Sequence, residues 1–344
     1  MPGSSEFGTS VALDGDTALI GAPSDAGDIG RASAGAAYVF SRTGEQWALE
    51  AKIVPSDATS RGFFGESVAL SEDVALIGGT GGVDDNGQDR RGSAYIFTRY
   101  DGTWAQEAKL LAADSVGGDY FGRAVALSGG TALIGADGDD DVGTGSGSAY
   151  LFMRSGDDWT ETAKLTASDG AAGHAFGRAV ALSGDTALVG AELHRSAYVF
   201  AQSMSGWAQQ ARLTASDPES GSYFGQSVAL FEGIALIGAP FHDGHAVDSG
   251  VVFQFVRSGE RWAEQAQLFS VEAAFRDGFG SAVATDGLRH VVGAFEADTE
   301  FGPDAGRAYV FEGDPSDFGD APDPGYPTLL ASDGARHRLS PLFL

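Results

Sequence analysis

A Phe-Gly pair recurs six times at nearly even spacing, and this repetition constrains the fold more than any other feature of the chain. Self-similarity at a fixed period is typical of arrays in which each copy is one structural unit. Successive copies are 57, 57, 55, 48 and 55 residues apart, with the pairs beginning at Phe7, Phe64, Phe121, Phe176, Phe224 and Phe279. We therefore expect six tandem units over most of the 344 residues.

Each copy contains strand-like segments separated by turn residues. In the second copy these are SVAL at 67–70, ALIGG at 75–79, SAYIF at 93–97 and WAQEAKL at 104–110. Their lengths and boundaries are those of strands. No window keeps a helical period for more than two turns, which argues against helices. The sequence predicts four strands per repeat.

The strands differ in a way that orders them within a sheet. The ALIGG-type run is apolar on both faces, as expected of an interior strand. The tryptophan strand alternates, with Trp47, Leu49, Ala51 and Ile53 on one face and Ala48, Glu50 and Lys52 on the other. Such a strand is a half-solvated edge, where charge discourages pairing with other edges. Four strands with a charged outer edge are typical of a propeller blade. We predict an all-β fold, a β-propeller of six or seven four-stranded blades spanning residues 5–312.

The sixth copy lacks a tryptophan strand, and residues 313–344 allow two interpretations. The segment Gly313–Pro327 is rich in Pro, Gly and Asp, which is typical of a linker to a following module. Alternatively, LLASDGA at 329–335 echoes KLTASDGA at 164–171 and supplies the missing edge strand. We prefer the linker, because no tryptophan precedes this segment.

These motifs resemble the FG-GAP repeat, which builds the propeller of integrin α subunits. Phe7-Gly8 with Gly21-Ala22-Pro23, and Phe224-Gly225 with Gly238-Ala239-Pro240, match it fully. Integrin-type repeats carry a DxDxDG calcium loop between these two motifs, but here a tight turn replaces it, so that calcium cage is not expected. The chain is more similar to the bacterial branch of large secreted or surface proteins. DFGDAPDPGYPTLLASDGARH at 317–337 also resembles a stretch found in such proteins.

The charge balance excludes several classes of partner. The chain has 48 acidic and 21 basic residues, a net charge of -27, and contains no cysteine. Nucleic acid and anionic membranes are therefore not expected as partners. Disulfides and thiolate metal sites are excluded. No apolar run approaches the ~18 residues of a membrane span, so membrane insertion is not expected. Strong negative charge favours a monomeric domain, here within a larger chain.

Two acidic loops are candidates for calcium (Ca2+), the only cofactor that the sequence suggests. In GADGDDDVGTGSG at 135–147, Asp137, Asp139 and Asp141 stand at alternate positions. Alternating carboxylates in a turning loop can converge on one calcium ion. The alternative is a solvated acidic loop. A weaker candidate is VDDNGQD at 83–89, with Asp84, Asp85 and Asp89.

Three further patterns carry a structural and a functional interpretation each. His242, Asp243 and His245 could ligate a transition metal, although surface loops produce such triplets by chance. The tryptophans could stack on sugars, but their fixed place in each repeat favours packing between blades. An aspartate follows the edge strand in four copies. It either caps the turn or forms a set of hydrogen bonds or calcium sites repeated from blade to blade. These aspartates are Asp57, Asp114, Asp169 and Asp217.

The chain carries none of the common catalytic motifs, and we do not expect an enzyme. There is no G-x-S-x-G, H-E-x-x-H or phosphate-binding loop. The favoured function is an extracellular or cell-surface interaction or adhesion module, which binds an unidentified protein or glycan through its variable loops. The alternative is a structural spacer stabilised by cations. A glycan- or ester-cleaving enzyme is a third and weaker hypothesis, since carboxylates are abundant.

Overall fold

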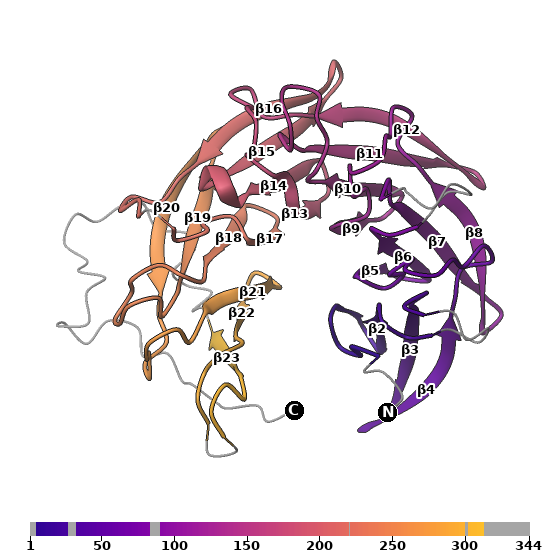
Figure 1. Ribbon diagram of the computed structural model, residues 1–344, viewed down its shortest axis with the longest axis horizontal. Coiled ribbons are helices and arrows are strands. Elements are labelled where there is room, and N and C mark those ends of the chain that lie inside the picture. The colour runs from indigo at the N-terminus through magenta and orange to yellow at the C-terminus, as the bar shows by residue number, and fades with distance from the viewer. Residues whose placement is uncertain (1–4, 27–31, 83–89, 220, 300–301, 313–344) are drawn as a thin grey trace. The chain divides into compact units, whose positions relative to one another are not determined.

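The protein is built almost wholly of antiparallel strands. The computed structural model describes residues 5–26, 32–82, 90–219, 221–299 and 302–312 (Figure 1). Within these residues the one helical element is the three-residue 3-10 turn Glu192–His194, so no helix is long and apolar enough to cross a membrane. The predicted all-β class is confirmed.

The first three sheets each contain four strands in chain order. The first contains β1 (Val11–Asp14), β2 (Thr17–Ala22), β3 (Ala36–Thr43) and β4 (Gln46–Ile53). The second contains β5 (Ser67–Ser71), β6 (Val74–Gly79), β7 (Ser93–Tyr100) and β8 (Thr103–Leu110). The third contains β9 (Val125–Ser128), β10 (Thr131–Ala136), β11 (Ser148–Ser155) and β12 (Asp158–Leu165).

The fourth and fifth sheets repeat this order, and the sixth has three strands among the described residues. The fourth contains β13 (Phe176–Ser183), β14 (Thr186–Ala191), β15 (Ser196–Ser203) and β16 (Gly206–Leu213). The fifth contains β17 (Ser227–Phe231), β18 (Ile234–Ala239), β19 (Val251–Ser258) and β20 (Arg261–Leu268). The sixth contains β21 (Phe279–Thr285), β22 (Arg289–Ala294) and β23 (Arg307–Glu312). These sheets are the blades of a β-propeller, as predicted.

The chain divides into two compact units. The first comprises residues 1–194 and 200–209, and the second comprises 195–199 and 210–344. The first three sheets lie in the first unit, whereas the fifth and sixth lie in the second. In the first unit, the edge strands β5, β9 and β13 of successive sheets lie side by side (Figure 1). The edge strand that we considered at 329–335 falls outside the described residues, as does the proposed linker.

The strands take the places that their sequences predict. The second strand of each sheet is hydrogen-bonded on both sides, and in β6, β10 and β18 every residue after the first is buried. The tryptophan strand lies at the outer edge of each four-stranded sheet, with a mixed pattern of exposed and half-buried residues. An interior strand that is apolar on both faces needs cover on both, which neighbouring sheets supply.

Within each unit, the glycine that ends the interior strand of one sheet meets the Phe-Gly pair of the next sheet. A Cβ on Gly78 would stand 2.2 Å from the carbonyl oxygen of Gly122, so only glycine allows this approach. Phe121, which precedes Gly122, is fully buried and forms a parallel bridge with Gly92. Burying such a ring contributes roughly 2 kcal/mol. The close approach recurs at Gly21, Gly135 and Gly238.

In four sheets the buried phenylalanine of the Phe-Gly pair packs edge-on against two aromatic rings of the third strand in its own sheet; these are Phe64, Phe121, Phe224 and Phe279. Phe121 contacts Tyr150 and Phe152, with ring centroids 5.5 and 6.0 Å apart. Phe7 makes the same contacts but is 50% exposed, whereas Phe64 and Phe121 are at most 1% exposed. Phe64 is buried because residues of the preceding sheet, among them Leu19 and Val39, pack in the same cluster.

The tryptophan strand departs from the strict alternation that we expected. The register between β7 and β8 shifts between Ile96 and Phe97, so Glu107 has no partner opposite it, as in a β-bulge. The register between β3 and β4 shifts in the same way, so Glu50 of β4 also has no residue opposite it. A bulge re-aims its side chain, and Glu50 contacts Trp104 and Arg99 of the next sheet. The prediction that Leu49 and Ala51 share one face was wrong, because they pair with the consecutive residues Phe40 and Val39 and the bulge breaks the two-residue period.

Candidate functional site

A tyrosine and a lysine lie opposite each other in the first three sheets. The register pairs Tyr38 with Lys52, Tyr95 with Lys109 and Tyr150 with Lys164, across the third and fourth strands. Each ammonium lies over the ring of its tyrosine, at 5.1 to 5.6 Å from the centroid. This pair presents a phenol and a cation together to the loops at one end of the sheet.

Aspartates reach these pairs from two places in the chain. In the first sheet, Asp25 of the β2–β3 loop accepts hydrogen bonds from Tyr38 (2.7 Å) and Lys52 (3.1 Å). In the second sheet, the acceptor is Asp57, which follows the edge strand of the first sheet. Asp25 therefore bonds the tyrosine and lysine of its own sheet, whereas Asp57 forms a contact between two consecutive sheets.

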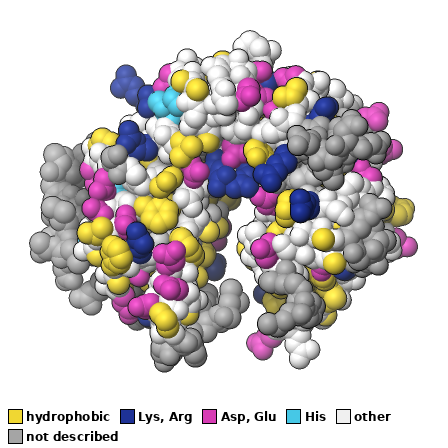
Figure 2. Space-filling model, in the orientation of Figure 1, with side chains coloured by type: hydrophobic (Ala, Val, Ile, Leu, Met, Phe, Trp, Pro, Cys, Tyr) yellow, Lys and Arg dark blue, Asp and Glu magenta, His cyan; other side chains and the backbone are white. Residues whose placement is uncertain are grey.

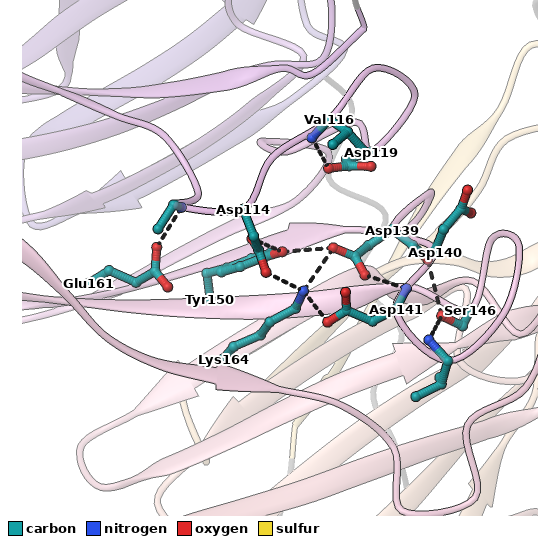
Figure 3. A network of polar contacts seen from close by, with 12 residues as sticks. Asp114, Val116, Asp119, Asp139, Asp140, Asp141, Ser146, Tyr150, Glu161 and Lys164 are labelled. Atoms are coloured by element: carbon teal, nitrogen blue, oxygen red, sulfur yellow. Dashed lines mark hydrogen bonds and ion pairs between the residues drawn. The ribbon is translucent and has the colours of Figure 1, made fainter.

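The third sheet uses both sources and forms the densest carboxylate cluster of the described residues (Figure 3). Lys164 Nζ lies 2.7 Å from Asp114 and 3.0 Å from Asp139, and it also pairs with Asp141. The hydroxyl oxygen of Tyr150 lies 2.7 Å from a carboxylate oxygen of Asp139 and 2.9 Å from one of Asp114, so the two carboxylates share its one proton donor. The three aspartates each offer an oxygen within 4.8 Å of the others. They could hold a cation, and the Lys164 ammonium lies among them.

The electrostatics of this cluster favour ion pairing over proton transfer. Burial lowers the pKa of the Lys164 ammonium, but hydrogen bonds to Asp114, Asp141 and Asp139 outweigh it and raise the pKa above its usual range. Burial, followed by the bonds to Asp139 and Asp114, also raises the pKa of the Tyr150 phenol. A general base needs a pKa near the working pH, which for lysine means a lowered value. Lys164 and Tyr150 therefore stay protonated at neutral pH.

The structure separates the three aspartates that we predicted as one calcium site. Asp139 and Asp141 meet at Lys164, but Asp137 contacts Arg178 Nη1 at 3.1 Å and lies 3.8 Å from Arg123 Nε. Oδ1 of Asp137 is buried without a hydrogen-bond partner among the described residues. The loop turns between Ala136 and Asp139, whose N–H donates to the Ala136 carbonyl, so alternate positions do not share a face. Calcium binding by Asp137, Asp139 and Asp141 stays a prediction, while the carboxylates that lie together are those of Asp114, Asp139 and Asp141.

The other predicted metal ligands do not form a described site. Asp84, Asp85 and Asp89 lie outside the described residues. The ring of His245 stacks on Phe269, with centroids 4.5 Å apart. His242 is buried, with Nε2 3.1 Å from the Asp217 carbonyl and Nδ1 3.6 Å from Glu219. Asp243 Oδ1 accepts from the Asp248 N–H.

The recurrent aspartates after the edge strands contact the sheet that follows them. Asp57 accepts from Tyr95 and Lys109, and Asp114 accepts from Tyr150 and Lys164. In the second unit, Gln267 donates to Asp217 at 3.1 Å. Of the two interpretations of these aspartates, the structure supports the repeated set of hydrogen bonds.

Sequence reasoning missed the lysines, although the sequence held a signal. The three lysines of the chain stand at one repeat position, in WALEAKI, WAQEAKL and WTETAKL. A residue type that occurs nowhere else, always opposite the tyrosine of the AYVF-type strand, indicates a specific partner. The predicted packing of tryptophans between sheets is confirmed for Trp104 and Trp159, which lie against the cores formed by neighbouring sheets, whereas Trp47 is 44% exposed.

Comparison with known proteins identifies the repeat. The family model described as FG-GAP repeat matches six segments, residues 3–40, 47–97, 104–152, 159–200, 207–255 and 262–311. The crystal structure of a protein from Lactobacillus plantarum is similar with a TM-score of 0.59 and 14% sequence identity, covering 97% of this chain and 83% of that one. At this identity the likeness concerns the fold. No curated protein sequence matches the chain.

Proposed function

Because the chain belongs to the FG-GAP repeat family, we propose that it is a non-catalytic interaction module of a secreted or surface protein. The fold is that of a protein-interaction or structural module. In our proposal it binds a protein or glycan partner through the loops that join the second and third strands. It acts outside the cell, in an adhesive role, as a monomeric part of a larger chain. Function is set by sites carried on a fold, so recognition is assigned to these loops and not to the sheets.

The variation of these loops is the observation that carries the proposal. The loop spans residues 137–147 in the third sheet and 240–250 in the fifth, but only 192–195 in the fourth. The strands that flank it keep six and eight residues in these sheets. Recognition usually resides in variable loops on a constant scaffold. The pKa shifts at Lys164 and Tyr150 also speak against acid-base catalysis at the carboxylate cluster.

A second candidate function is a spacer that binds no specific partner and is stabilised by cations. The convergence of Asp114, Asp139 and Asp141 favours it, because three carboxylates beside one ammonium leave a net negative site. Calcium prefers such oxygen ligands.

A loop exchange tests the first proposal against the second. The protein is screened on arrays of glycans and extracellular matrix proteins, together with a variant in which residues 240–250 are replaced by the fourth-sheet loop 192–195. A matched variant makes the same replacement at 137–147. We expect a specific ligand whose binding is lost in one exchange variant and kept in the other, with both variants folded by circular dichroism. A uniformly blank screen with folded protein supports the spacer.

A further inference from the structure

The fifth sheet replaces every member of the tyrosine, lysine and aspartate set that the first and third sheets carry. Phe253 lies opposite Gln267 across the third and fourth strands, at the register positions that tyrosine and lysine hold in those sheets. His242 stands four residues after Gly238, where the third sheet has Asp139 after its own glycine. The phenol and the ammonium are therefore lost together, and an imidazole takes the place of a carboxylate.

The carboxylates around His242 have no lysine or arginine partner among the described residues of the second unit. Asp217 accepts a 3.1 Å hydrogen bond from the neutral Gln267, and Glu219 accepts one of 2.8 Å from the Asp243 N–H. Asp and Glu side chains are spread over the face seen in Figure 2, so acidic residues alone do not mark a site. The buried imidazole distinguishes this group from the others.

The surroundings of His242 fix both its orientation and its tautomer. The side chain is 7% exposed, and its ring packs edge-on against Phe253 with centroids 5.5 Å apart. Nε2 lies 3.1 Å from the carbonyl oxygen of Asp217. A carbonyl only accepts, so Nε2 carries the hydrogen, and Nδ1 of the neutral ring has a lone pair. Histidines that bind metals are typically held in this way, with the second ring nitrogen donating to a carbonyl or carboxylate.

Nδ1 of His242 faces a carboxylate across a distance too long for a hydrogen bond. It is buried without a hydrogen-bond partner among the described residues, and it lies 3.6 Å from Oε2 of Glu219. A hydrogen bond from a charged N–H to a carboxylate is about 2.8 Å long. Two ligands with bonds of about 2.1 Å to a tetrahedral zinc ion lie about 3.4 Å apart. The separation therefore fits a shared metal ion better than a shared proton.

We propose that Nδ1 of His242 and Oε2 of Glu219 bind a zinc ion. Imidazole nitrogen suits zinc and its neighbours among the transition metals, whereas calcium takes oxygen ligands. The Glu219 side chain is 33% exposed, so water reaches the ion and completes its coordination. Asp217 is a positioning residue, since its carbonyl holds the ring. The site goes beyond the proposed interaction function and does not depend on it.

This site differs from the triplet of His242, Asp243 and His245 that the sequence suggested. The ring of His245 stacks on Phe269, and Oδ1 of Asp243 accepts from the Asp248 N–H. The second ligand comes instead from the segment after β16, so the ion joins this segment to the loop between β18 and β19.

Titration of zinc chloride into the full chain in metal-free buffer, followed by calorimetry, tests the site. His242→Gln and Glu219→Gln should each weaken zinc binding at least about tenfold. His245→Gln is the matched control and should bind as the wild type does. Asp139→Asn should also keep this binding, because it alters only the carboxylate cluster of the third sheet. Circular dichroism verifies that each variant is folded, and the partly exposed Glu219 provides a test that leaves the buried ring in place.

Imidazole nitrogen resonances show which atom binds the ion. Zinc should shift Nδ1 of His242 in the wild type and leave the ring of His245 unchanged. Equal zinc affinity in the wild type, His242→Gln and Glu219→Gln would overturn the proposal. It would also be wrong if only His242→Gln lost binding, since Glu219 would then not be a ligand. Loss of zinc in Asp139→Asn, with Nδ1 of His242 unshifted, would assign the ion to the third sheet and refute the site.

Discussion

Trp104 Nε1 donates a 3.0 Å hydrogen bond to Oε1 of Glu50 in the preceding sheet. The bulge in β4 turns Glu50 toward this neighbour, where it also pairs with Arg99 at 3.2 Å. Trp159 bonds Glu107 in the same way, and Trp262 bonds Gln210 in the second unit. The side chain three positions after one tryptophan thus accepts a hydrogen bond from the indole of the tryptophan in the next sheet. This contact orients successive sheets more specifically than apolar packing alone.

The fourth sheet breaks this rule, which predicts a stabilising substitution. Thr162 stands at the acceptor position before Trp207, but its hydroxyl bonds the Leu151 carbonyl, and Trp207 Nε1 is buried without a partner among the described residues. Thr162→Gln should add about 1 kcal/mol to the free energy of unfolding by satisfying the indole. Urea denaturation measures the gain. Thr162→Val should show none, and a gain that persists in a Trp207→Phe background would contradict the mechanism.

The close approach of neighbouring sheets predicts that stability depends on Gly78 of the second sheet but not on the equivalent Gly293 of the sixth sheet. A Cβ on Gly78 would stand 2.2 Å from the Gly122 carbonyl oxygen, whereas on Gly293 the nearest atoms are 3.5 Å away. Gly78→Ala should therefore destabilise the protein by about 3 kcal/mol, because the backbone must move. Gly293→Ala should change stability by less than about 1 kcal/mol. Thermal unfolding compares the two variants, and equal losses would refute the packing argument.

The carboxylate of Asp114 predicts part of the response of stability to acid. Burial raises its pKa, but hydrogen bonds from Lys164 and Tyr150 outweigh burial and hold the pKa below its usual range. A lowered pKa stabilises the fold above the unfolded value of about 3.9 and loses this effect as pH falls through the folded value. The side chain is 48% exposed, so we expect only about 0.5 kcal/mol after solvent screening.

Asp114→Asn tests this dependence by urea denaturation at several pH values. Its stability deficit relative to the wild type should be largest near pH 7 and should shrink below about pH 4, where both proteins carry a neutral group. The exposed Asp101→Asn is the control, since no other described side chain bonds its carboxylate. A deficit that grows on acidification would show that the sign of our argument is wrong.

The ammonium of Lys164 should determine how strongly calcium stabilises the cluster of Asp114, Asp139 and Asp141. This ammonium pairs with Asp114, Asp139 and Asp141, and removing it leaves the buried carboxylate of Asp139 without a cation, which costs about 2 kcal/mol. Lys164→Met should be destabilised in chelator and should recover with millimolar calcium, because the ion replaces the lost charge. At a calcium concentration of 100 times Kd, the free energy of unfolding should rise by about 2.7 kcal/mol.

Thermal melts with calcium and with chelator measure the effect in the wild type, Lys164→Met and Lys52→Met. The wild type should respond less than Lys164→Met, since calcium must displace the ammonium. Lys52→Met removes the equivalent lysine of the first sheet, which pairs with Asp25. It should gain no calcium response over the wild type, because it leaves Lys164 and its three aspartates intact. If calcium leaves Lys164→Met unchanged, this cluster is not a calcium site.

The order of the strands was predictable because each carries its environment in its own composition. The apolar β6 had to be interior, and β8, with its tryptophan and charges, had to be an edge. The bulge was not predictable, because Glu50 and Glu107 look like ordinary solvent-facing residues of an alternating strand. Their role depends on an indole and a guanidinium from the next sheet.

The sequence by itself determined the repeat, the all-β class and the residue types at each junction, since Phe-Gly and Gly-Ala pairs recur along the chain. Tertiary structure alone decided which carboxylates meet. Asp139 joins Asp114, which lies in the segment before the sheet, because a turn at Ala136 rotates Asp137 toward Arg178 and Arg123. Spacing along a chain describes neighbours on an extended strand, but a turn changes direction within two residues. Only the folded backbone fixes where those side chains point.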